Sequence, residues 1–143
     1  MQLKQIMIAL SLIVMTHSSL SESTKQVTFY EKQQLECLAT NIYHEARGEP
    51  LDGQILVAKV TLNRSRSYTD ICNVVYQYKQ FSWTLYKNKK VTDVKAYRKA
   101  FDAAHLAIWS DSDCTHFHTK KVKPVWRRSL KICDNIGNHI FYK

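Results

Sequence analysis

The feature that most constrains the fold is a helical apolar pattern that stops near residue 48 and then resumes. Apolar residues first recur at the i, i+3, i+4 spacing of an amphipathic helix, at Leu35, Leu38, Ala39, Ile42 and Ala46. Gly48 and Pro50 then form a helix-stop signal. Proline also suits the first turn of a following helix, where its missing N–H has no partner to lose. The pattern predicts one helix over 31–47 and a second over 50–64.

Two further helices are expected after the loop at 65–70. A short one covers 71–76, and a long one covers 93–109 with Thr92 as its N-cap. Apolar residues on one face of the long helix predict its buried stripe: Val94, Tyr97, Phe101, Ala104 and Ile108.

The C-terminal third changes character. Segments 114–119 and 138–143 alternate in polarity and are rich in aromatic residues, which is typical of strands. Pro124, Trp126 and Gly137 mark turns between them. A chain of 143 residues favours one domain. We therefore expect an α+β fold, with a mainly helical core and a small antiparallel β-sheet.

The N-terminus has the pattern of a secretory signal peptide. Lys4 precedes the apolar run 6–15, and serines follow at 18, 19 and 21. The run is shorter than the about 20 residues of an ordinary membrane span, although an uncleaved anchor stays open as an alternative. We predict a signal peptide over 1–21 and one catalytic domain over 22–143. The protein is then exported, to the periplasm or the extracellular space, with no stable membrane span after signal removal.

All four cysteines lie beyond this segment, at Cys37, Cys72, Cys114 and Cys133. An even number in an exported chain predicts two disulfides. Four cysteines allow three pairings, and the sequence does not choose among them. The spacing contains no CxxC pair, so it is not a zinc pattern.

The formal net charge of +9 favours an anionic partner. Nucleic acid, a membrane surface and a cell-wall polymer all have that charge. Export and the lack of a nucleic-acid-binding motif disfavour nucleic acid. A cell-wall polymer is therefore the favoured partner.

Two carboxylates at the end of the first predicted helix suggest acid–base chemistry. A carboxylic acid protonates a leaving oxygen only if it stays protonated, and burial achieves this by disfavouring the charged form. Glu45 lies on the packed helix, whereas Glu49 stands between Gly48 and Pro50 and is expected to be more exposed. One sheltered and one wetter carboxylate is an arrangement used in glycosidic cleavage. The alternative is a solvated helix end in which Arg47 pairs with a glutamate.

Several polar and aromatic residues are candidates for substrate contacts. Gln54 and Asn63 interrupt a largely apolar helix, so each either faces a cleft or bonds to backbone groups. Segment 78–90 is aromatic, polar and basic without a helical stripe. Its Phe81 and Trp83 either stack on sugar rings or fill the core beneath a loop.

A metal site is a weaker hypothesis. His44 and Glu45 begin like the HExxH zinc motif, but Gly48 stands at the position of the second histidine. Three later histidines would have to converge with His44 to replace it: His116, His118 and His139. We expect no metal and no cofactor.

Four segments carry a family resemblance in their order and spacing: NIYHEARGEPLDGQILVAKVTLNR, VVYQYKQFSW, THFHTKKVKPVW and IGNHIFY. Together they resemble the SleB-type cell wall hydrolases, over nearly all of residues 35–143. The resemblance implies a lysozyme-like fold and cleavage of peptidoglycan glycan strands, by a lytic transglycosylase mechanism in the best-studied members. It also implies that Glu45 is the catalytic acid. Ala46 stands where many relatives have serine.

The sequence thus predicts a monomeric peptidoglycan lytic transglycosylase in which Glu45 acts first as acid and then as base. The candidate substrate-binding residues are Tyr43, Glu49, Gln54, Asn63, Gln80, Phe81, Ser82, Trp83, His116 and His118. Two alternatives stay open. A hydrolytic muramidase would need Glu49 or Asp52 to activate water, and a non-catalytic wall-binding or inhibitor module would not need Glu45.

Overall fold

The computed structural model describes residues 29–143. The predicted signal peptide over 1–21 lies outside the described residues and stays a prediction. The chain divides into two compact units, Met1–Lys32 and Gln33–Lys143. The second unit contains every candidate site residue and is the one described below.

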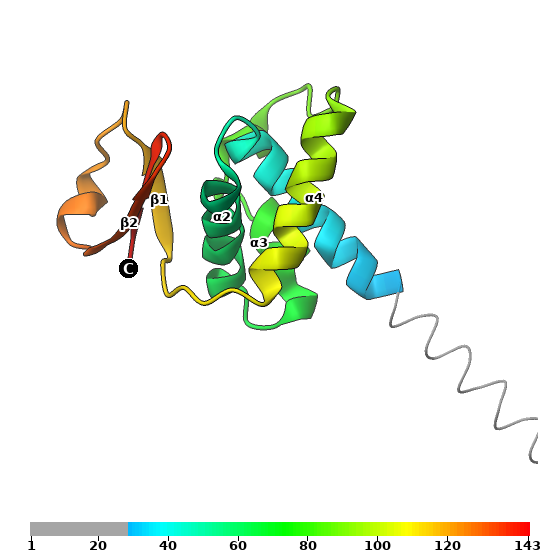
Figure 1. Ribbon diagram of the computed structural model, residues 1–143, viewed down its shortest axis with the longest axis horizontal. Helices are drawn as coiled ribbons and strands as arrows, with labels where there is room; N and C mark the ends of the chain where they lie inside the picture. Colours follow the sequence, from blue (N-terminus) through cyan, green and yellow to red (C-terminus); the bar gives the residue numbers. More distant parts are fainter. Residues whose placement is uncertain (1–28) are drawn as a thin grey trace, which may run out of the picture. The chain divides into compact units, whose positions relative to one another are not determined.

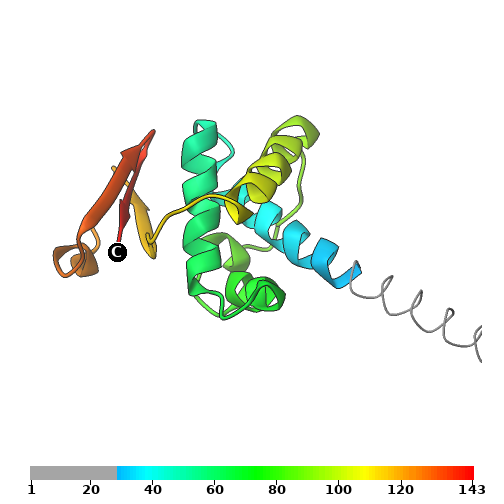
Figure 2. The same cartoon turned by 60° about the horizontal axis from the view of Figure 1, so that its bottom comes forward.

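Four α-helices lie in the described residues. The first is helical over 29–46 and is followed by α2 (Leu51–Arg64), α3 (Ile71–Tyr76) and α4 (Val94–Ile108). Short 3-10 helices occur at Tyr68–Asp70 (η1), Ser82–Leu85 (η2) and Val125–Arg128 (η3). The helices group together, with α2 on the side that faces the sheet (Figures 1 and 2). The predicted helices are confirmed to within about two residues at each end, the usual uncertainty of such boundaries.

Helix α4 differs from its prediction in its cap and in part of its buried face, although Tyr97, Phe101, Ala104 and Ile108 do pack in or against the core. The side chain of Asp93, not Thr92, caps the helix by accepting a hydrogen bond of 2.9 Å from the backbone N–H of Ala96. Val94 at its start is 66% exposed. The buried face is made of four alanines, Ala100, Ala103, Ala104 and Ala107. Such small side chains permit α4 to pack closely against α2.

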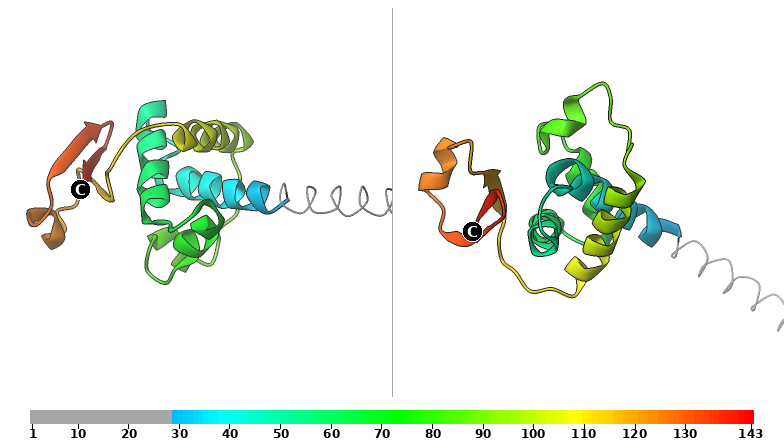
Figure 3. Two further views of the ribbon diagram at one scale, coloured as in Figure 1. Left: turned by 90° about the horizontal axis from the view of Figure 1, so that it is seen from below. Right: turned by 45° about the horizontal axis from the view of Figure 1, so that its top comes forward.

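A three-stranded antiparallel sheet follows the helices. Its strands are β1 (His116–Thr119), β2 (Ile132–Ile136) and β3 (His139–Tyr142), in the order β1-β3-β2 (Figure 3). Strands β1 and β3 confirm the two predicted strands. The prediction missed β2, whose sequence ICDNI has no regular alternation and whose pairing with β3 is irregular between Ile132 and Asp134.

The hydrophobic core joins the helices to the sheet. Leu38 and Ile42 of the first helix, Val57 and Val60 of α2, and Phe141 of β3 are all fully buried. Burial of this kind stabilises by about 1.5–3 kcal/mol for each large apolar side chain. The core thereby fixes the sheet against the same helices that carry the candidate acid.

A buried polar bridge crosses this core. The side-chain amide of Asn41 donates to the hydroxyl of Thr61 at 3.1 Å and accepts from the indole N–H of Trp83 at 2.8 Å. Both sides of the amide are therefore satisfied, as burial requires. The bridge connects the first helix, α2 and η2.

Two disulfides staple the unit, as predicted. Cys37–Cys72 joins the first helix to α3, and Cys114–Cys133 joins the segment before β1 to β2. No cysteine is free. No helix in the described part of the chain is long and apolar enough to cross a membrane.

Thiol titration checks the oxidised state. We expect the unfolded, unreduced protein to show no reactive thiol, because all four cysteines are paired. The same protein after reduction is the control and should show four. Four thiols without reduction would contradict both disulfides.

Candidate active site

A polar cleft of about 680 Å³ opens between the helices and the sheet. This volume lies within the range of about 300–1,000 Å³ that is usual for ligand sites. It is lined by Glu45, Arg64, Val74, Gln77, Lys79, Gln80, Phe81, Ser82, His116, Phe117 and Trp126. The first helix, α2, α3, β1 and η3 each contribute, so the whole fold is needed to build the cleft.

Glu45 is the one carboxylate that lines this cleft among residues 29–143. Burial raises the pKa of its carboxyl from 4.5 to about 7. Within the described structure, no hydrogen bond or ion pair offsets that burial. Glu45 can therefore hold a proton near neutral pH and also release it, which general acid–base catalysis requires.

Three of the other predicted residues are consecutive in the chain and line the same cleft as Glu45. Gln80, Phe81 and Ser82 all line the cleft. Ser82 is exposed, whereas Phe81 is mostly buried and forms the base of the cleft wall. The side chains of Gln80 and Ser82 can donate hydrogen bonds to, and accept them from, the hydroxyls and amides of a sugar.

Tyr43 and Trp83 do not line the cleft, contrary to the prediction. Trp83 is 4% exposed, stacks on His44 with ring centroids 4.3 Å apart, and uses its N–H on Asn41. The hydroxyl of Tyr43 accepts the backbone N–H groups of Thr92 and Asp93 at 3.3 and 3.2 Å. Their polar atoms are used inside the protein, so both residues serve the fold.

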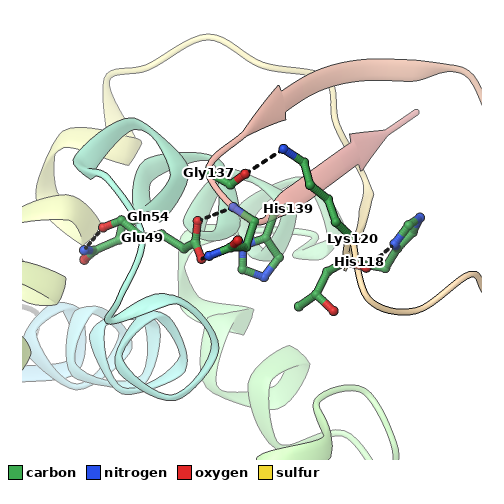
Figure 4. Close-up of polar contacts among 8 residues, drawn as sticks. Glu49, Gln54, His118, Lys120, Gly137 and His139 are labelled. Carbon is green, nitrogen blue, oxygen red and sulfur yellow. Dashed lines mark hydrogen bonds and ion pairs between the residues drawn. The ribbon is translucent and has the colours of Figure 1, made fainter.

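Glu45 and Glu49 are both partly buried, and Glu49 lies against the turn between β2 and β3. Its side chain is only 8% exposed, because the turn between β2 and β3 covers it (Figure 4). Its carboxylate accepts the backbone N–H of Asn138 at 2.8 Å and the side-chain amide of Asn138 at 3.1 Å. His139 Nδ1 lies 3.7 Å away, and Gln54 donates to the Glu49 backbone carbonyl at 2.9 Å.

These contacts favour the ionised form of Glu49, whereas burial favours the protonated form of Glu45. Burial opposes the ionisation of Glu49, but the Asn138 hydrogen bonds and His139 outweigh burial and lower the pKa of the carboxyl. Neither Glu49 nor Gln54 lines the cleft. Arg47 does not pair with Glu49 and instead lies over the Tyr43 ring, 5.0 Å from its centroid. The Glu49 carboxylate therefore joins the end of the first helix to the turn between β2 and β3.

Of the last three predicted residues, one lines the cleft and two make hydrogen bonds elsewhere in the fold. His116 lines the cleft, and burial, followed by the charge of Arg64, lowers the pKa of its imidazole. His118 is buried and bonds to the hydroxyl of Tyr142 at 2.8 Å. Asn63 is exposed and donates to the backbone carbonyls of Ser112 and Cys114, both at 2.8 Å.

Six cleft residues were missed by sequence reasoning: Arg64, Val74, Gln77, Lys79, Phe117 and Trp126. Trp126 is 37% exposed and lies beside the rings of His116 and Tyr142, with centroids 5.2 and 5.5 Å away. It is the partly exposed tryptophan of the cleft and can stack on a sugar. The signal was present in the sequence, since Trp126 also stands in a basic segment without a helical stripe.

A metal centre has no counterpart in the described residues, where no three His, Cys, Asp or Glu side chains gather as possible ligands. The three histidines that would have joined His44 are separated by their contacts. His116 lines the cleft, His118 bonds to Tyr142, and His139 lies beside Glu49.

The site is thus a cleft between a helical core and a small sheet, with one sheltered acid in its lining. The chain belongs to the cell wall hydrolase family, which matches residues 48–142. That match begins after Glu45, so it carries no information on the acid itself. The predicted SleB-type resemblance and the α+β fold are both confirmed.

Two curated relatives are spore cortex-lytic enzymes. The chain is 29% identical to the spore cortex-lytic enzyme of Halalkalibacterium halodurans over 128 residues, covering 87% of this chain and 39% of that protein. It is also 29% identical to the spore cortex-lytic enzyme of Oceanobacillus iheyensis over 125 residues, covering 80% and 43%. The chain thus spans about two fifths of the length of these curated relatives.

The structural neighbours are catalytic domains. The catalytic domain of the Bacillus cereus SleB protein superposes with a TM-score of 0.66 and 25% identity, over 78% of this chain and 91% of that one. The catalytic domain of the germination-specific lytic transglycosylase SleB from Bacillus anthracis gives 0.65 and 26%, over 77% and 93%. The part shared with this chain is therefore nearly the whole of each of those domains.

Proposed function

We propose that this chain cleaves peptidoglycan glycan strands between N-acetylmuramic acid and N-acetylglucosamine by a lytic transglycosylase mechanism. The observation that supports it is Glu45, the one cleft carboxylate among the described residues, whose pKa is raised to about 7. The relatives are named as a lytic transglycosylase and as spore cortex-lytic enzymes. We further infer that the protein acts as an exported monomer on the anionic cell wall, in keeping with its net charge of +9.

The reaction needs one residue that gives a proton and takes it back. Protonated Glu45 donates to the glycosidic oxygen as the bond from that oxygen to C1 of the muramic sugar breaks. An oxocarbenium-like centre develops at C1. The ionised Glu45 then accepts the proton of the C6 hydroxyl on the same sugar. The oxygen of that hydroxyl bonds to C1. The product is a 1,6-anhydro ring, and Glu45 ends protonated as it began.

The placement of the other carboxylates favours this mechanism over hydrolysis. A hydrolase needs a second carboxylate, either to activate water or to attack the sugar. Glu49 is held in hydrogen bonds from Asn138, and neither it nor the exposed Asp52 lines the cleft. The cleft thus supplies one acid–base residue and no partner for it among residues 29–143.

A non-catalytic binding module explains the site less well. Such a module would use the aromatic and basic residues of the cleft, including Trp126, Lys79 and Arg64. It would gain nothing from a buried carboxyl without a hydrogen-bond partner, because that group disfavours the folded state whenever it ionises. Acid–base chemistry gives this raised pKa a use.

Product analysis tests the mechanism. Peptidoglycan is digested to completion, and the muropeptides are weighed by mass spectrometry. We expect 1,6-anhydromuramic ends, each lighter by one water than the reducing ends that a hydrolase leaves. A parallel digest with a hydrolytic lysozyme is the control for reducing ends. Reducing ends as the main product would reject transglycosylation and make Glu49→Gln the next variant.

A further inference from the structure

Arg64 is held rigidly in the wall of the cleft. It is the last residue of α2, and its Nε donates to the backbone carbonyl of Thr115 at 2.6 Å. Its guanidinium carbon lies 6.0 Å from the centroid of the Phe81 ring. Two contacts from different elements thus hold the group at the cleft wall. A guanidinium fixed in this way is preorganised to bind a planar, oxygen-rich group.

The Arg64 cation pairs with no carboxylate among residues 29–143. Within the described residues its guanidinium makes the Thr115 hydrogen bond and no salt bridge. Glu45 is the sole carboxylate of the cleft lining, and burial alone accounts for its raised pKa, so Arg64 does not pair with it. Arg64 is partly buried, and this burial lowers the pKa of its guanidinium. Most of its donor capacity therefore remains for a ligand.

The substrate offers one kind of anion at this place. This step rests on the proposed function. The muramic sugar carries a lactyl ether that ends in a carboxylate or continues into a stem peptide with carboxylates of its own. The glucosamine sugar carries no acidic group. Carboxylate is one of the groups that an arginine fork binds with two parallel hydrogen bonds.

We propose that Arg64 binds a carboxylate on the lactyl–peptide substituent of the muramic sugar and so determines which sugar lies with its C1 beside Glu45. Arg64 is then a specificity residue that reads the substituent, while Glu45 acts on the ring. A polymer of glucosamine sugars alone would lack the group that Arg64 reads.

The experiment crosses the residue with the substrate group. Glycan strands freed of peptide by an amidase carry the lactyl carboxylate, and amidation with ammonia and a carbodiimide makes it neutral. Peptide-bearing strands, with and without amidation, form a second pair. We expect amidation to reduce kcat/KM of the wild-type protein by about ten- to a hundred-fold, mainly through KM, since a hydrogen bond to a charged group contributes about 1.5–3 kcal/mol.

The variant Arg64→Gln should have a low kcat/KM on charged strands and lose the effect of amidation. Arg128→Gln removes the same charge from an exposed residue of η3 outside the cleft lining, and should respond to amidation like the wild type. An effect confined to the peptide-free pair identifies the lactyl carboxylate, and one confined to the peptide-bearing pair identifies the stem peptide.

Two results would overturn the proposal. One is a wild-type protein that cleaves charged and amidated strands equally in both pairs, and this result needs no variant. The other is an Arg64→Gln protein that keeps the full amidation effect. If Arg64→Gln fails to fold, Arg64→Lys keeps the charge without the fork and should retain only part of the effect. A wild-type protein that cleaves no strand at all would instead reject the proposed function.

Discussion

Replacing Glu45 with glutamine is expected to reduce the lysis of purified sacculi by about a hundred- to ten-thousand-fold, the usual contribution of a general acid–base residue. Glutamine keeps the shape of the side chain but can neither donate nor recover the proton. Turbidity of a sacculus suspension measures the rate, and circular dichroism confirms that the variant is folded. Near wild-type lysis by a folded variant would contradict the assignment and favour the binding module.

The pH dependence of the wild-type protein gives the same prediction a second readout. The acid must be protonated at the start of the reaction, and burial raises the pKa of Glu45 to about 7. The value of kcat/KM should therefore fall as pH rises through about 7. Asp52→Asn is the matched control, because Asp52 is exposed and outside the cleft lining. A large loss in Asp52→Asn would revive the muramidase alternative.

Replacing Gly137 with alanine is expected to destabilise the fold by about 2–4 kcal/mol. Gly137 has a φ of +56° in the turn between β2 and β3, a conformation that costs a non-glycine residue about 1–3 kcal/mol. An added Cβ would also collide with Glu49 Oε2 and lie 3.0 Å from Pro50 Cδ. The carboxylate would have to leave the Asn138 hydrogen bonds, and an unsatisfied buried group costs about 1–3 kcal/mol. Denaturant unfolding measures the loss.

Gly48→Ala is the control for this prediction. Gly48 does not have a positive φ, and an added Cβ there meets no atom within 4 Å. The free energy of unfolding of the Gly48→Ala variant should differ from that of the wild type by less than about 0.5 kcal/mol, as for other surface substitutions. If Gly137→Ala were as stable as Gly48→Ala, the turn would not depend on glycine and the Glu49 junction would tolerate displacement.

The helices were predictable because their signals are local. The spacing from Leu35 to Ala46, the stop at Gly48 and the resumption after Pro50 all lie within one short stretch of sequence. Packing against α2 is a long-range property, and there the prediction for α4 was only partly right. Four of the five predicted residues pack in or against the core: Tyr97, Phe101, Ala104 and Ile108. The alanines of α4 face the core, and Val94, which continues the apolar pattern, faces solvent.

The candidate site was predictable where position along the helix fixes burial, and elsewhere it was not. Glu45 precedes the buried Ala46, and its sheltered position follows from that spacing. Glu49 is covered by Asn138, which is 89 residues away in sequence, so no local pattern reveals the contact. The burial of Trp83 was unpredictable for a similar reason, because its hydrogen-bond partner Asn41 is 42 residues away in sequence. Which tryptophan lines the cleft depends on such distant partners.

The lack of a hydrogen-bond partner at Glu45 has a consequence for the folding equilibrium. Its folded-state pKa is above its unfolded value of 4.5, so its contribution to stability is present below about pH 4.5 and is lost as pH rises through about 7. The loss reaches at most about 3 kcal/mol. Glu45→Gln should thus resist thermal unfolding like the wild type at pH 4.5 and better than it at pH 8, by roughly 1–3 kcal/mol. Equal melting at both pH values would show that the carboxyl is solvated. If Glu45→Gln is instead the more stable protein at pH 8, the wild type keeps, at neutral pH, a residue that weakens its own fold.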